Sequence, residues 1–543
     1  MAGLPPGWRP QVWSDDRVSR ALSWYRAVME GSAPAKFLIA KSVESPEDPL
    51  RLDTAALWGL HSELSREFQS LWREAREGRL GRIRSFGRSY LKVKAELARR
   101  LASPCELCER RCRVDRVRRL GVCRQPLGAA IVHDWFLHPG EEDPLVPSGT
   151  IFYGGCNFRC VFCQNYEVSQ TSPLSGTRLD PRGLAAVQGE LRLSGALNIN
   201  HVGGEPTPSL PVVLESLVHL DVSVPQLWNS NFYMTPEAME LLRDVVDIWL
   251  PDFKYGNDEC ALRLSGAPKY VEVVTRNLLA AVDSGDVIVR HLVLPGHLEC
   301  CTRPALRWIS ENLPRDRILV NIMDQYRPEY LVARRPGWHR WSDVSRMPSA
   351  DEIREAREIA RELGLVYEPI SRSQTFSAMA RERATMDAKS LREMAERLSK
   401  LELEYADRLR SSAEGVGNPA VRAVMLAVAQ DSVKHSMLYG TIAELLRGEG
   451  PLMDEKQMDR LAREIDDHIR VEEEMIREAR ELSSSASREC VKLVAESIAE
   501  DEERHHRLLV AVRDVILRRE TLTEDEIWEM TWKYAVWHGT PGG

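Results

Sequence analysis

The sequence lacks the features that would place it in or across a membrane. It has no apolar run near the ~18 residues that a membrane-spanning helix needs. Its first residues, Met1-Ala-Gly-Leu-Pro-Pro, do not form a basic stretch followed by an apolar core, so we expect no signal peptide. These absences predict a protein without a membrane partner.

The chain also lacks a strong excess of either charge. Its 73 basic and 81 acidic residues give a net charge of −8, which favours a soluble protein and gives no reason to expect nucleic acid as a partner. Cysteine, by contrast, is plentiful. Most of the 11 cysteines fall into two groups with metal-ligand spacing, and Cys300 and Cys301 are adjacent, which argues for a reducing compartment. We therefore expect a cytoplasmic protein.

With 543 residues, 43% of them hydrophobic, the chain is long enough for several domains. Arg17–Met29 and Thr54–Arg76 have the apolar spacing of amphipathic helices, and we expect Trp8, Trp13 and Trp24 to serve packing rather than cofactor binding. The predicted divisions are a helical region (1–100), a four-cysteine segment (101–145), an α/β core (146–370), a linker (371–385), a helical bundle (386–520) and a tail (521–543).

Strand and helix patterns alternate through the predicted core. The expected strands are Thr150–Tyr153, Leu197–Val202, Val224–Asn229, Val246–Leu250, Val287–Leu294 and Ile318–Met323. The expected helices are Pro181–Leu193, Leu210–His219, Pro236–Val245, Val271–Asp283, Arg303–Asn312 and Ala350–Leu363. This alternation predicts a parallel sheet curved into a partial (β/α)6 barrel like part of a TIM barrel, with ligands at the carboxyl ends of its strands.

A cysteine motif directly follows the first predicted strand of the core. Cys156, Cys160 and Cys163 are spaced Cys-x3-Cys-x2-Cys, with Phe162 before the last cysteine. A short loop can bring three thiolates to one iron–sulfur cluster, and three ligands leave one iron of a cubane cluster open. Three buried or zinc-binding cysteines are the weaker alternative.

Polar and glycine-rich motifs follow the next strands and should meet at the same edge of the sheet. These are Gly203-Gly204-Glu205, then Asn229 and Asn231, then Asp252 and Lys254, and finally Arg290. Paired glycines allow a polar ligand to lie against the backbone, and a carboxylate can accept from an ammonium group. An Asp252–Lys254 surface ion pair and a purely structural Arg290 are the alternatives. His291, His297, Asp324, Gln325 and Tyr326 are candidates for substrate contact.

The Cys-x3-Cys-x-Phe-Cys motif is similar to the signature of radical S-adenosylmethionine (SAM) enzymes. Residues 85–370 more closely resemble the pyruvate formate-lyase-activating-enzyme-like branch of that superfamily. The resemblance implies that Cys156, Cys160 and Cys163 hold a catalytic [4Fe–4S] cluster and that Gly203 to Glu205 hold the amino group of SAM. It also implies that Asp252, Lys254 and Arg290 contact SAM, and that a ferredoxin- or flavodoxin-like reductant supplies the electron.

Four cysteines precede the core, namely Cys105, Cys108, Cys112 and Cys123. They can hold a structural zinc ion or a second iron–sulfur cluster, and spacing alone leaves both open. Full activating enzymes often have an eight-cysteine insert instead, so glycyl-radical activation is not secured. Seven nearby arginines suggest a nucleic-acid ribbon or a solvated surface beside a metal site, of which we favour the second; they are Arg110, Arg111, Arg113, Arg116, Arg118, Arg119 and Arg124.

The C-terminal part contains an internal repeat with an offset of seventy residues. Ala429–His435 aligns with Ala499–His505, and the same offset superposes Glu402 on Glu472. Two helical hairpins of this kind resemble the four-helix bundle of ferritin-like and rubrerythrin-like proteins, which implies iron bound by Glu402, His435, Glu472, Glu502 and His505. Ser432 occupies the place of one expected glutamate, so a purely structural bundle is the alternative.

Together these patterns predict a radical SAM oxidoreductase with a fused ferritin-like domain for metal handling or for protection against oxygen or peroxide. Its substrate would be a protein or peptide, such as a glycyl-radical enzyme, or a small molecule. The alternative is a non-catalytic iron–sulfur or zinc scaffold with a helical bundle for partner docking. A protein substrate predicts an open mouth above the sheet, and a small one predicts a lid.

Overall fold

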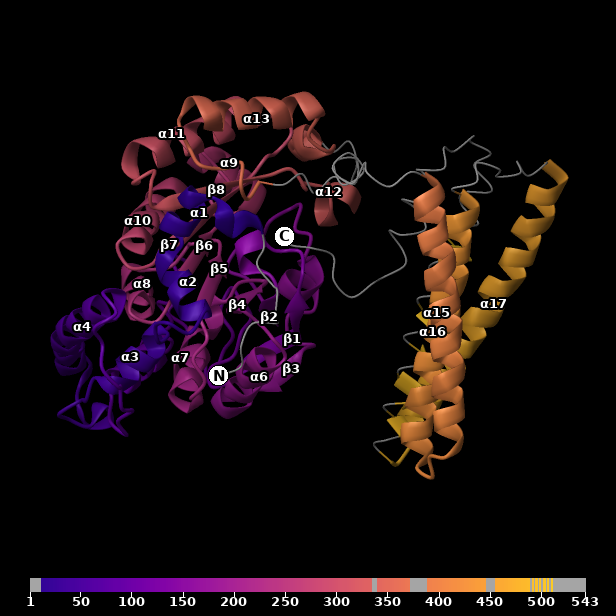
Figure 1. Cartoon of the computed structure of the whole chain (residues 1–543), viewed down its shortest axis with the longest axis horizontal. Helices are drawn as coiled ribbons and strands as arrows, with labels where there is room; N and C mark the ends of the chain where they lie inside the picture. The colour runs from indigo at the N-terminus through magenta and orange to yellow at the C-terminus, as the bar shows by residue number, and fades with distance from the viewer. Residues whose placement is uncertain are drawn as a thin grey trace. The chain divides into compact units, whose positions relative to one another are not determined.

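The structure is a computed structural model, and it describes residues 11–334, 339–371, 388–445 and 455–488, with further residues between 491 and 510 (Figure 1). The chain divides into two compact units, one essentially Met1–Met379 and the other Ala380–Thr540. Trp8, the predicted tail and nearly all of the predicted linker lie outside the described residues. None of the described helices is long and apolar enough to cross a bilayer.

The first unit is built on one open sheet with the strand order β3-β1-β2-β4-β5-β6-β7-β8. Its parallel strands are β2 (Ser148–Tyr153), β4 (Ile199–Gly203), β5 (Gln226–Ser230), β6 (Ile248–Pro251), β7 (Asp286–Leu292) and β8 (Ile318–Met323). All six predicted strands are thus confirmed. β1 (Ala130–His138) and β3 (Thr177–Leu179), which the sequence did not reveal, extend one edge of the sheet in antiparallel fashion.

Helices connect the parallel strands and cover the sheet. They are α6 (Pro181–Leu193), α7 (Leu210–His219), α8 (Pro236–Arg243), α9 (Asp258–Ser265), α10 (Tyr270–Val282), α11 (Arg303–Asn312) and α13 (Ala350–Glu362). Side-chain caps define several of their starts: Asp180 accepts from Gly183 N at 2.8 Å, and Ser349 forms a capping box with Glu352. The helix α9 is the only one of this set that the sequence analysis missed.

The N-terminal helices pack on two parts of this unit: the first two contact β8 and β7, and the last packs on α7 and α8. They are α1 (Asp16–Ala21), α2 (Ser23–Met29), α3 (Lys36–Ser42), α4 (Thr54–Arg76) and α5 (Tyr90–Leu101). The single helix predicted over Arg17–Met29 is two helices, because the backbone leaves helical geometry at Leu22. Trp24 is buried and donates from Nε1 to Asp247 Oδ1 at 2.9 Å, which confirms its expected packing role.

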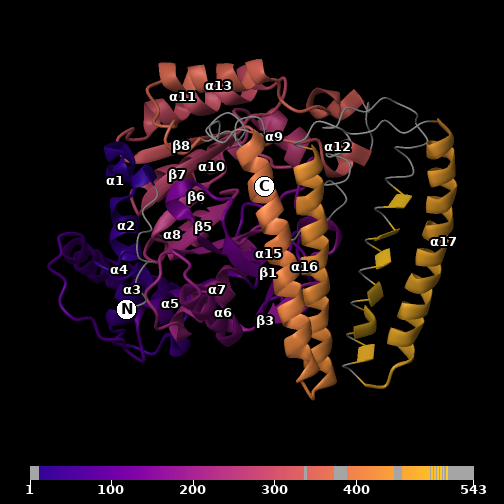
Figure 2. The same cartoon turned by 45° about the vertical axis from the view of Figure 1, so that its right-hand side comes forward.

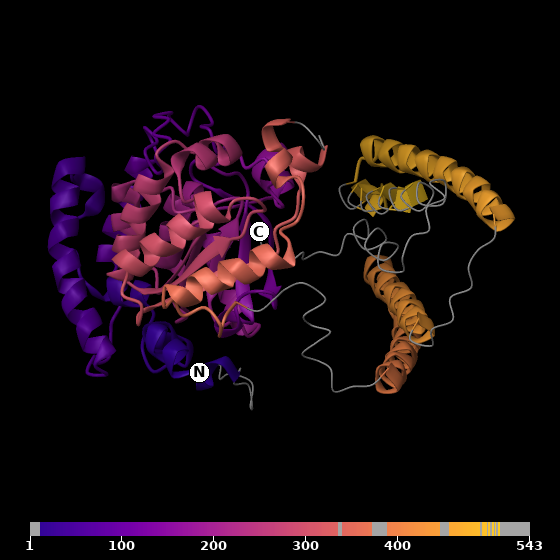
Figure 3. The ribbon, with the colours of Figure 1, turned by 90° about the horizontal axis from the view of Figure 1, so that it is seen from above.

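The second unit is helical, as predicted. α15 (Ala388–Glu414) and α16 (Pro419–Leu445) lie side by side as a hairpin (Figures 2 and 3). α17 (Glu455–Ser485) packs its buried Ile465 and Ile469 against Leu509 and Val510. The described residues therefore show hairpin pairing in both halves of the sequence repeat, while their assembly into a ferritin-like bundle stays a prediction.

Candidate active site

A cavity opens at the carboxyl ends of the parallel strands. Its lining brings together residues from the loop after β2, from the ends of β4, β5 and β6, and from the ends of β7 and β8. The lining residues singled out in the sequence are Cys156, Cys160, Phe162, Cys163, Gly203, Gly204, Glu205, Asn229, Asn231, Asp252, Lys254, Gln325 and Tyr326. Segments more than 150 residues apart in the sequence therefore meet at one site.

The three loop cysteines are held by specific polar contacts. Cys156 Sγ accepts from Phe158 N at 3.3 Å, Cys160 Sγ lies 2.9 Å from Ser265 Oγ, and Cys163 Sγ lies 3.3 Å from Ser169 Oγ. Burial raises the pKa of all three thiols, that of Cys160 to about 11. Metal binding at this loop must therefore displace protons, so it will be favoured by higher pH.

The glycines beside this loop occupy positions that no other residue fits. Gly203 has φ +115°, and a Cβ atom there would lie 2.2 Å from Tyr153 N. A Cβ atom on Gly204 would lie 2.1 Å from Gly155 O. The end of β4 and the cysteine loop therefore touch through their backbones, which leaves the cavity lined by main-chain groups at this point.

Glu205 is buried at the junction of β4 and β5. Its Oε1 accepts from Thr207 N at 3.2 Å, Thr207 Oγ1 at 2.5 Å and Ser230 Oγ at 2.7 Å, and its Oε2 accepts from Asn231 N at 2.9 Å. Burial raises the pKa of Glu205, and these donors offset part of that effect. The result is a fixed carboxylate at the cavity wall, suited to a cationic ligand.

Asp252 and Lys254 form an ion pair at the end of β6. Both side chains are only 15% exposed and line the cavity, so they are not the surface pair that we weighed as an alternative. Burial works against the charge on Lys254, but the Asp252 carboxylate and the Cys160 sulfur outweigh it and raise its pKa. A permanent cation therefore lies beside the cysteine loop.

Arg290 is the one proposed SAM contact that the structure places apart from this group. Its guanidinium is buried and paired with Glu141 and Glu142, and Glu142 also accepts from Asn321 Nδ2 at 2.8 Å. These acidic partners precede β2, in a loop that the sequence analysis did not consider. The geometry favours the structural alternative for Arg290.

The proposed substrate contacts divide in the same way. Gln325 and Tyr326 line the cavity, and Tyr326 packs edge-on against Phe162 with 5.3 Å between ring centroids. His291 is buried between Phe253 O and Thr302 Oγ1, at 2.8 and 2.9 Å. His297 faces three cysteines outside the cavity lining, and Asp324 pairs with Arg357 at 3.3 Å.

Comparison with known proteins identifies the family. Residues 150–309 match the model of the Radical SAM superfamily. The chain is also 40% identical over 356 residues to Uncharacterized protein MJ0674 of Methanocaldococcus jannaschii, an alignment that covers 64% of this chain and 99% of that protein. The chain belongs to the radical SAM superfamily. It is accordingly an enzyme, and a [4Fe–4S] cluster and SAM are its cofactors.

Solved structures show weaker similarity. Streptococcus suis SuiB bound to precursor peptide SuiA is 11% identical with a TM-score of 0.31, and the match covers 58% of this chain and 65% of SuiB. The cobalamin-dependent S-adenosylmethionine radical enzyme OxsB is 12% identical with a TM-score of 0.24, and the match covers 70% of this chain and 57% of OxsB. The chain thus spans less than two thirds of either enzyme.

The cavity fits the cofactors of a radical SAM enzyme. The three cysteines would supply the thiolates, and Lys254 would supply a cation beside them. Asn229 Nδ2 is buried at the cavity without a hydrogen-bond partner among the described residues. An unsatisfied donor of this kind is costly in a folded protein, so a ligand acceptor is its natural partner.

The four-cysteine segment of this radical SAM chain packs directly on the cysteine loop. A Cβ atom on Gly155 would lie 2.2 Å from Cys123 O, and Arg110 Nε donates to Asn157 O at 2.8 Å. Cys105, Cys108, Cys112 and Cys123 line one small cavity beside Asn157. This grouping fits both predicted occupants, a zinc ion and a second iron–sulfur cluster.

The arginines around that segment are largely engaged within the protein. Arg116 is buried and donates to Gln125 O and Pro126 O, and Arg113 pairs with Glu106 at 2.8 Å. Arg111 has three acidic neighbours, the nearest 3.0 Å away. These pairings support the solvated-surface interpretation over a nucleic-acid ribbon.

The second unit brings the predicted iron ligands together within each half of the repeat. His435 Nδ1 lies 3.6 Å from Glu402 Oε1 in the first half. In the second half, His505 Nδ1 lies 3.9 Å from Glu472 Oε1 and 3.5 Å from Glu502 Oε2, and the three ligand atoms are mutually within 4.8 Å. The second half thus brings three possible metal ligands together, whereas the first half brings together two, Glu402 and His435.

Proposed function

We propose that this radical SAM enzyme holds its cluster through Cys156, Cys160 and Cys163, holds SAM over the ends of β4 to β6, and abstracts hydrogen from a substrate at the cavity described above. One observation carries the proposal: the residues singled out along more than 170 positions of sequence line a single cavity. When bound, the cluster supplies an electron that cleaves the sulfonium bond of SAM. The products are methionine and a 5′-deoxyadenosyl radical, which abstracts hydrogen.

The protein's own residues would position the cosubstrate and keep water away. Glu205 offers a fixed carboxylate for the ammonium group, and Asn229 Nδ2 offers a free donor. Lys254 stabilises negative charge on its side of the cavity, because Asp252 holds its ammonium in place. The close backbone contact at Gly204 lets the ligand approach main-chain groups. Each of these roles is orientation, which the cofactor chemistry requires of the chain.

The segment after β8 covers one side of the cysteine loop. Leu331 N donates to Val161 O at 2.9 Å, and Tyr330 stacks on Tyr166 with 4.9 Å between ring centroids. Such a cover favours a substrate small enough to be enclosed, or an extended peptide segment, over a large folded protein surface. We therefore propose a small molecule or a peptide segment as substrate, and a glycyl-radical loop falls within the second class.

The test is anaerobic reconstitution with iron and sulfide, reduction, addition of SAM, and measurement of 5′-deoxyadenosine. We expect 5′-deoxyadenosine from the wild-type chain and none from Cys160→Ala. Cys490→Ala, which removes a cysteine outside the proposed metal-ligand sets, is the matched control and should behave as wild type. Absence of 5′-deoxyadenosine despite a well-formed cluster would favour the non-catalytic scaffold.

We also propose that the second unit binds iron and protects the cluster from oxygen or peroxide. The observation that favours it is the convergence of Glu472, Glu502 and His505. The full-length chain is first stripped of its cluster iron, and the iron that it then binds is measured. This iron should fall by about half or more in His505→Ala, since one ligand of three is lost. Glu474→Gln changes an exposed glutamate of α17, the helix that carries Glu472, and should leave iron binding unchanged. Unchanged iron binding in His505→Ala would reject this role.

A further inference from the structure

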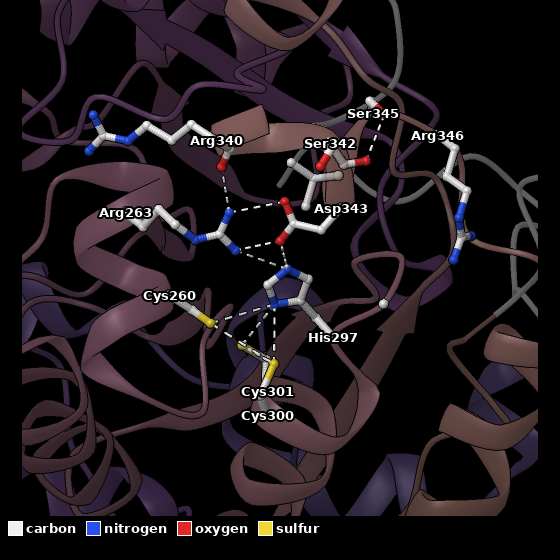
Figure 4. A network of polar contacts seen from close by, with 12 residues as sticks. Cys260, Arg263, His297, Cys300, Cys301, Arg340, Ser342, Asp343, Ser345 and Arg346 are labelled. Atoms are coloured by element: carbon white, nitrogen blue, oxygen red, sulfur yellow. Dashed lines mark hydrogen bonds and ion pairs between the residues drawn. The ribbon is translucent and has the colours of Figure 1, made fainter. Parts of the chain in front are cut away.

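A second group of metal-type ligands lies in the first unit, outside the cavity lining (Figure 4). Cys260 comes from α9, while His297, Cys300 and Cys301 come from the connection between β7 and α11. In Figure 4 the His297 ring points one nitrogen at the three sulfurs and the other at Asp343. The sequence analysis treated His297 as a substrate contact and assigned no site to the three cysteines.

The distances within this group are those of ligands around one ion. His297 Nδ1 lies 3.6 Å from Cys260 Sγ, 3.3 Å from Cys300 Sγ and 3.6 Å from Cys301 Sγ. Cys300 Sγ lies 3.9 Å from both other sulfurs. A tetrahedral zinc ion with bonds of about 2.3 Å to sulfur and about 2.0 Å to nitrogen separates its ligands by about 3.8 Å (S to S) and about 3.5 Å (S to N).

The same distances argue against the other uses of clustered cysteines. A sulfur separation of 3.9 Å is far from the ~2.05 Å of a disulfide, and these thiols are free. The sulfurs of a cubane cluster bind separate irons and lie further apart. Among the described residues, neither the cysteine loop nor the four-cysteine segment has three sulfurs mutually within 4.8 Å, whereas this group does. It is therefore built for a single ion.

The surroundings orient the ligands as metal sites require. His297 Nε2 lies 2.9 Å from Asp343 Oδ2, and Arg263 pairs with the same carboxylate, so Asp343 accepts the Nε2 proton and leaves Nδ1 as the metal-facing lone pair. Asn257 Nδ2 lies 3.4 Å from Cys260 Sγ, where it can donate to a thiolate. Three thiolates and one imidazole in tetrahedral array, closed by four protein ligands, are typical of structural zinc.

The position of the group suggests what the ion does. At its other end, α9 carries Ser265, whose Oγ lies 2.9 Å from Cys160 Sγ and whose carbonyl accepts from Arg159 N at 2.9 Å. Leu264 O also accepts from Val161 N at 2.9 Å. Five residues of helix, about 7.5 Å of axial rise, separate Cys260 from Ser265. An ion that fixes Cys260 therefore also fixes the end of α9 that holds the cysteine loop.

We propose that Cys260, His297, Cys300 and Cys301 bind one structural Zn²⁺ that fixes α9 to the β7–α11 connection and thereby steadies the cysteine loop of the active site. The ion has no part in the reaction itself. The proposal is independent of whether the substrate is a peptide or a small molecule.

Elemental analysis of the full-length chain, purified anaerobically, tests the proposal. The double variant Cys260→Ser/Cys301→Ser should contain about one zinc per chain less than wild type, and Cys490→Ser should lose none. The same difference is expected in a Cys108→Ser/Cys123→Ser background, which removes any zinc of the four-cysteine segment. X-ray absorption at the zinc edge in that background should show three sulfur ligands and one nitrogen ligand.

A second variant tests the proposal even if the double variant fails to fold. Asp343→Asn keeps all four ligands and removes the carboxylate behind His297, so zinc affinity in competition with a chelator should fall about 10- to 100-fold. Unchanged zinc content in the double variant, unchanged affinity in Asp343→Asn, iron in place of zinc, or a disulfide among the three cysteines would each overturn the proposal. The bracing role further predicts that zinc-depleted protein loses its cluster absorbance several-fold faster, and an unchanged rate would reject that role.

Discussion

Glu205→Gln tests the proposed cosubstrate site with the smallest change of shape. It keeps the length and planarity of the side chain and removes the negative charge that faces the cavity. Glu205 accepts four hydrogen bonds, two of them from the backbone N–H groups of Thr207 and Asn231. An amide has only one oxygen, so one of these two N–H groups must lose its acceptor.

Two free energies follow from this geometry. An unsatisfied buried donor costs about 1–3 kcal/mol, which should lower the free energy of unfolding of the first unit by that amount. Loss of a charge-assisted hydrogen bond to the ammonium of SAM costs about 1.5–3 kcal/mol, which corresponds to about 10- to 150-fold in affinity. The second effect appears in binding and the first does not, so the two can be separated.

The assay is the dissociation constant of SAM for reconstituted protein, measured beside denaturant unfolding of the same samples. Glu190→Gln, an exposed residue of α6, makes the same chemical change away from the cavity and should leave both quantities unchanged. If Glu205→Gln lowers stability but binds SAM as wild type does, Glu205 only stabilises the contact between the ends of β4 and β5. The proposed recognition of the ammonium group is then wrong.

Three further predictions concern the same unit. Gly204→Ala forces a Cβ atom to 2.1 Å from Gly155 O, so cluster iron should fall several-fold in elemental analysis, whereas Gly189→Ala, with open space around it, should keep full iron. Burial raises the pKa of Asp286 from 3.8 to about 7, so the folded state binds this proton more tightly than the unfolded chain. The free energy of unfolding should therefore fall as pH rises from about 4 to about 7 and then level off, and Asp286→Asn should flatten that slope in denaturant titrations. Arg290→Gln should lower the free energy of unfolding by about 3–5 kcal/mol, because it leaves two buried carboxylates without their cation, and it should change the affinity for SAM little. Unchanged stability with a large loss of SAM affinity would instead place Arg290 in the SAM site.

Much of the α/β core is predictable because its strands and helices follow simple periodicities. The six parallel strands are short β-branched runs bounded by turns, and α6, α7 and α11 have the predicted bounds. The antiparallel strand β1, which lies between β3 and β2, was missed because Ala130–His138 mixes apolar residues with histidine and aspartate. The helix α9 (Asp258–Ser265) was missed as well, although α8, also of eight residues, was predicted.

The site residues were predictable where the chemistry is local in sequence. The cysteine loop, Gly203 to Glu205, and Asp252 with Lys254 each form a compact motif at a strand end. Partnerships that depend on the path of a loop were not predictable. Arg290 meets Glu141, some 149 residues earlier, and His297 meets Cys260, 37 residues earlier. No spacing rule connects such positions, because only the folded backbone brings them together.

The cysteine loop is supported from three directions by segments that are distant in sequence. The four-cysteine segment meets it at Gly155 and Asn157, α9 meets it at Arg159 to Val161, and the segment after β8 meets it again at Val161. Two of these supports contain candidate metal ligands of their own. A loop of nine residues has little packing of its own, so its order must come from these neighbours. Metals at the two supports would therefore act on the reaction by fixing the loop, and their removal should weaken the cluster before it unfolds the sheet.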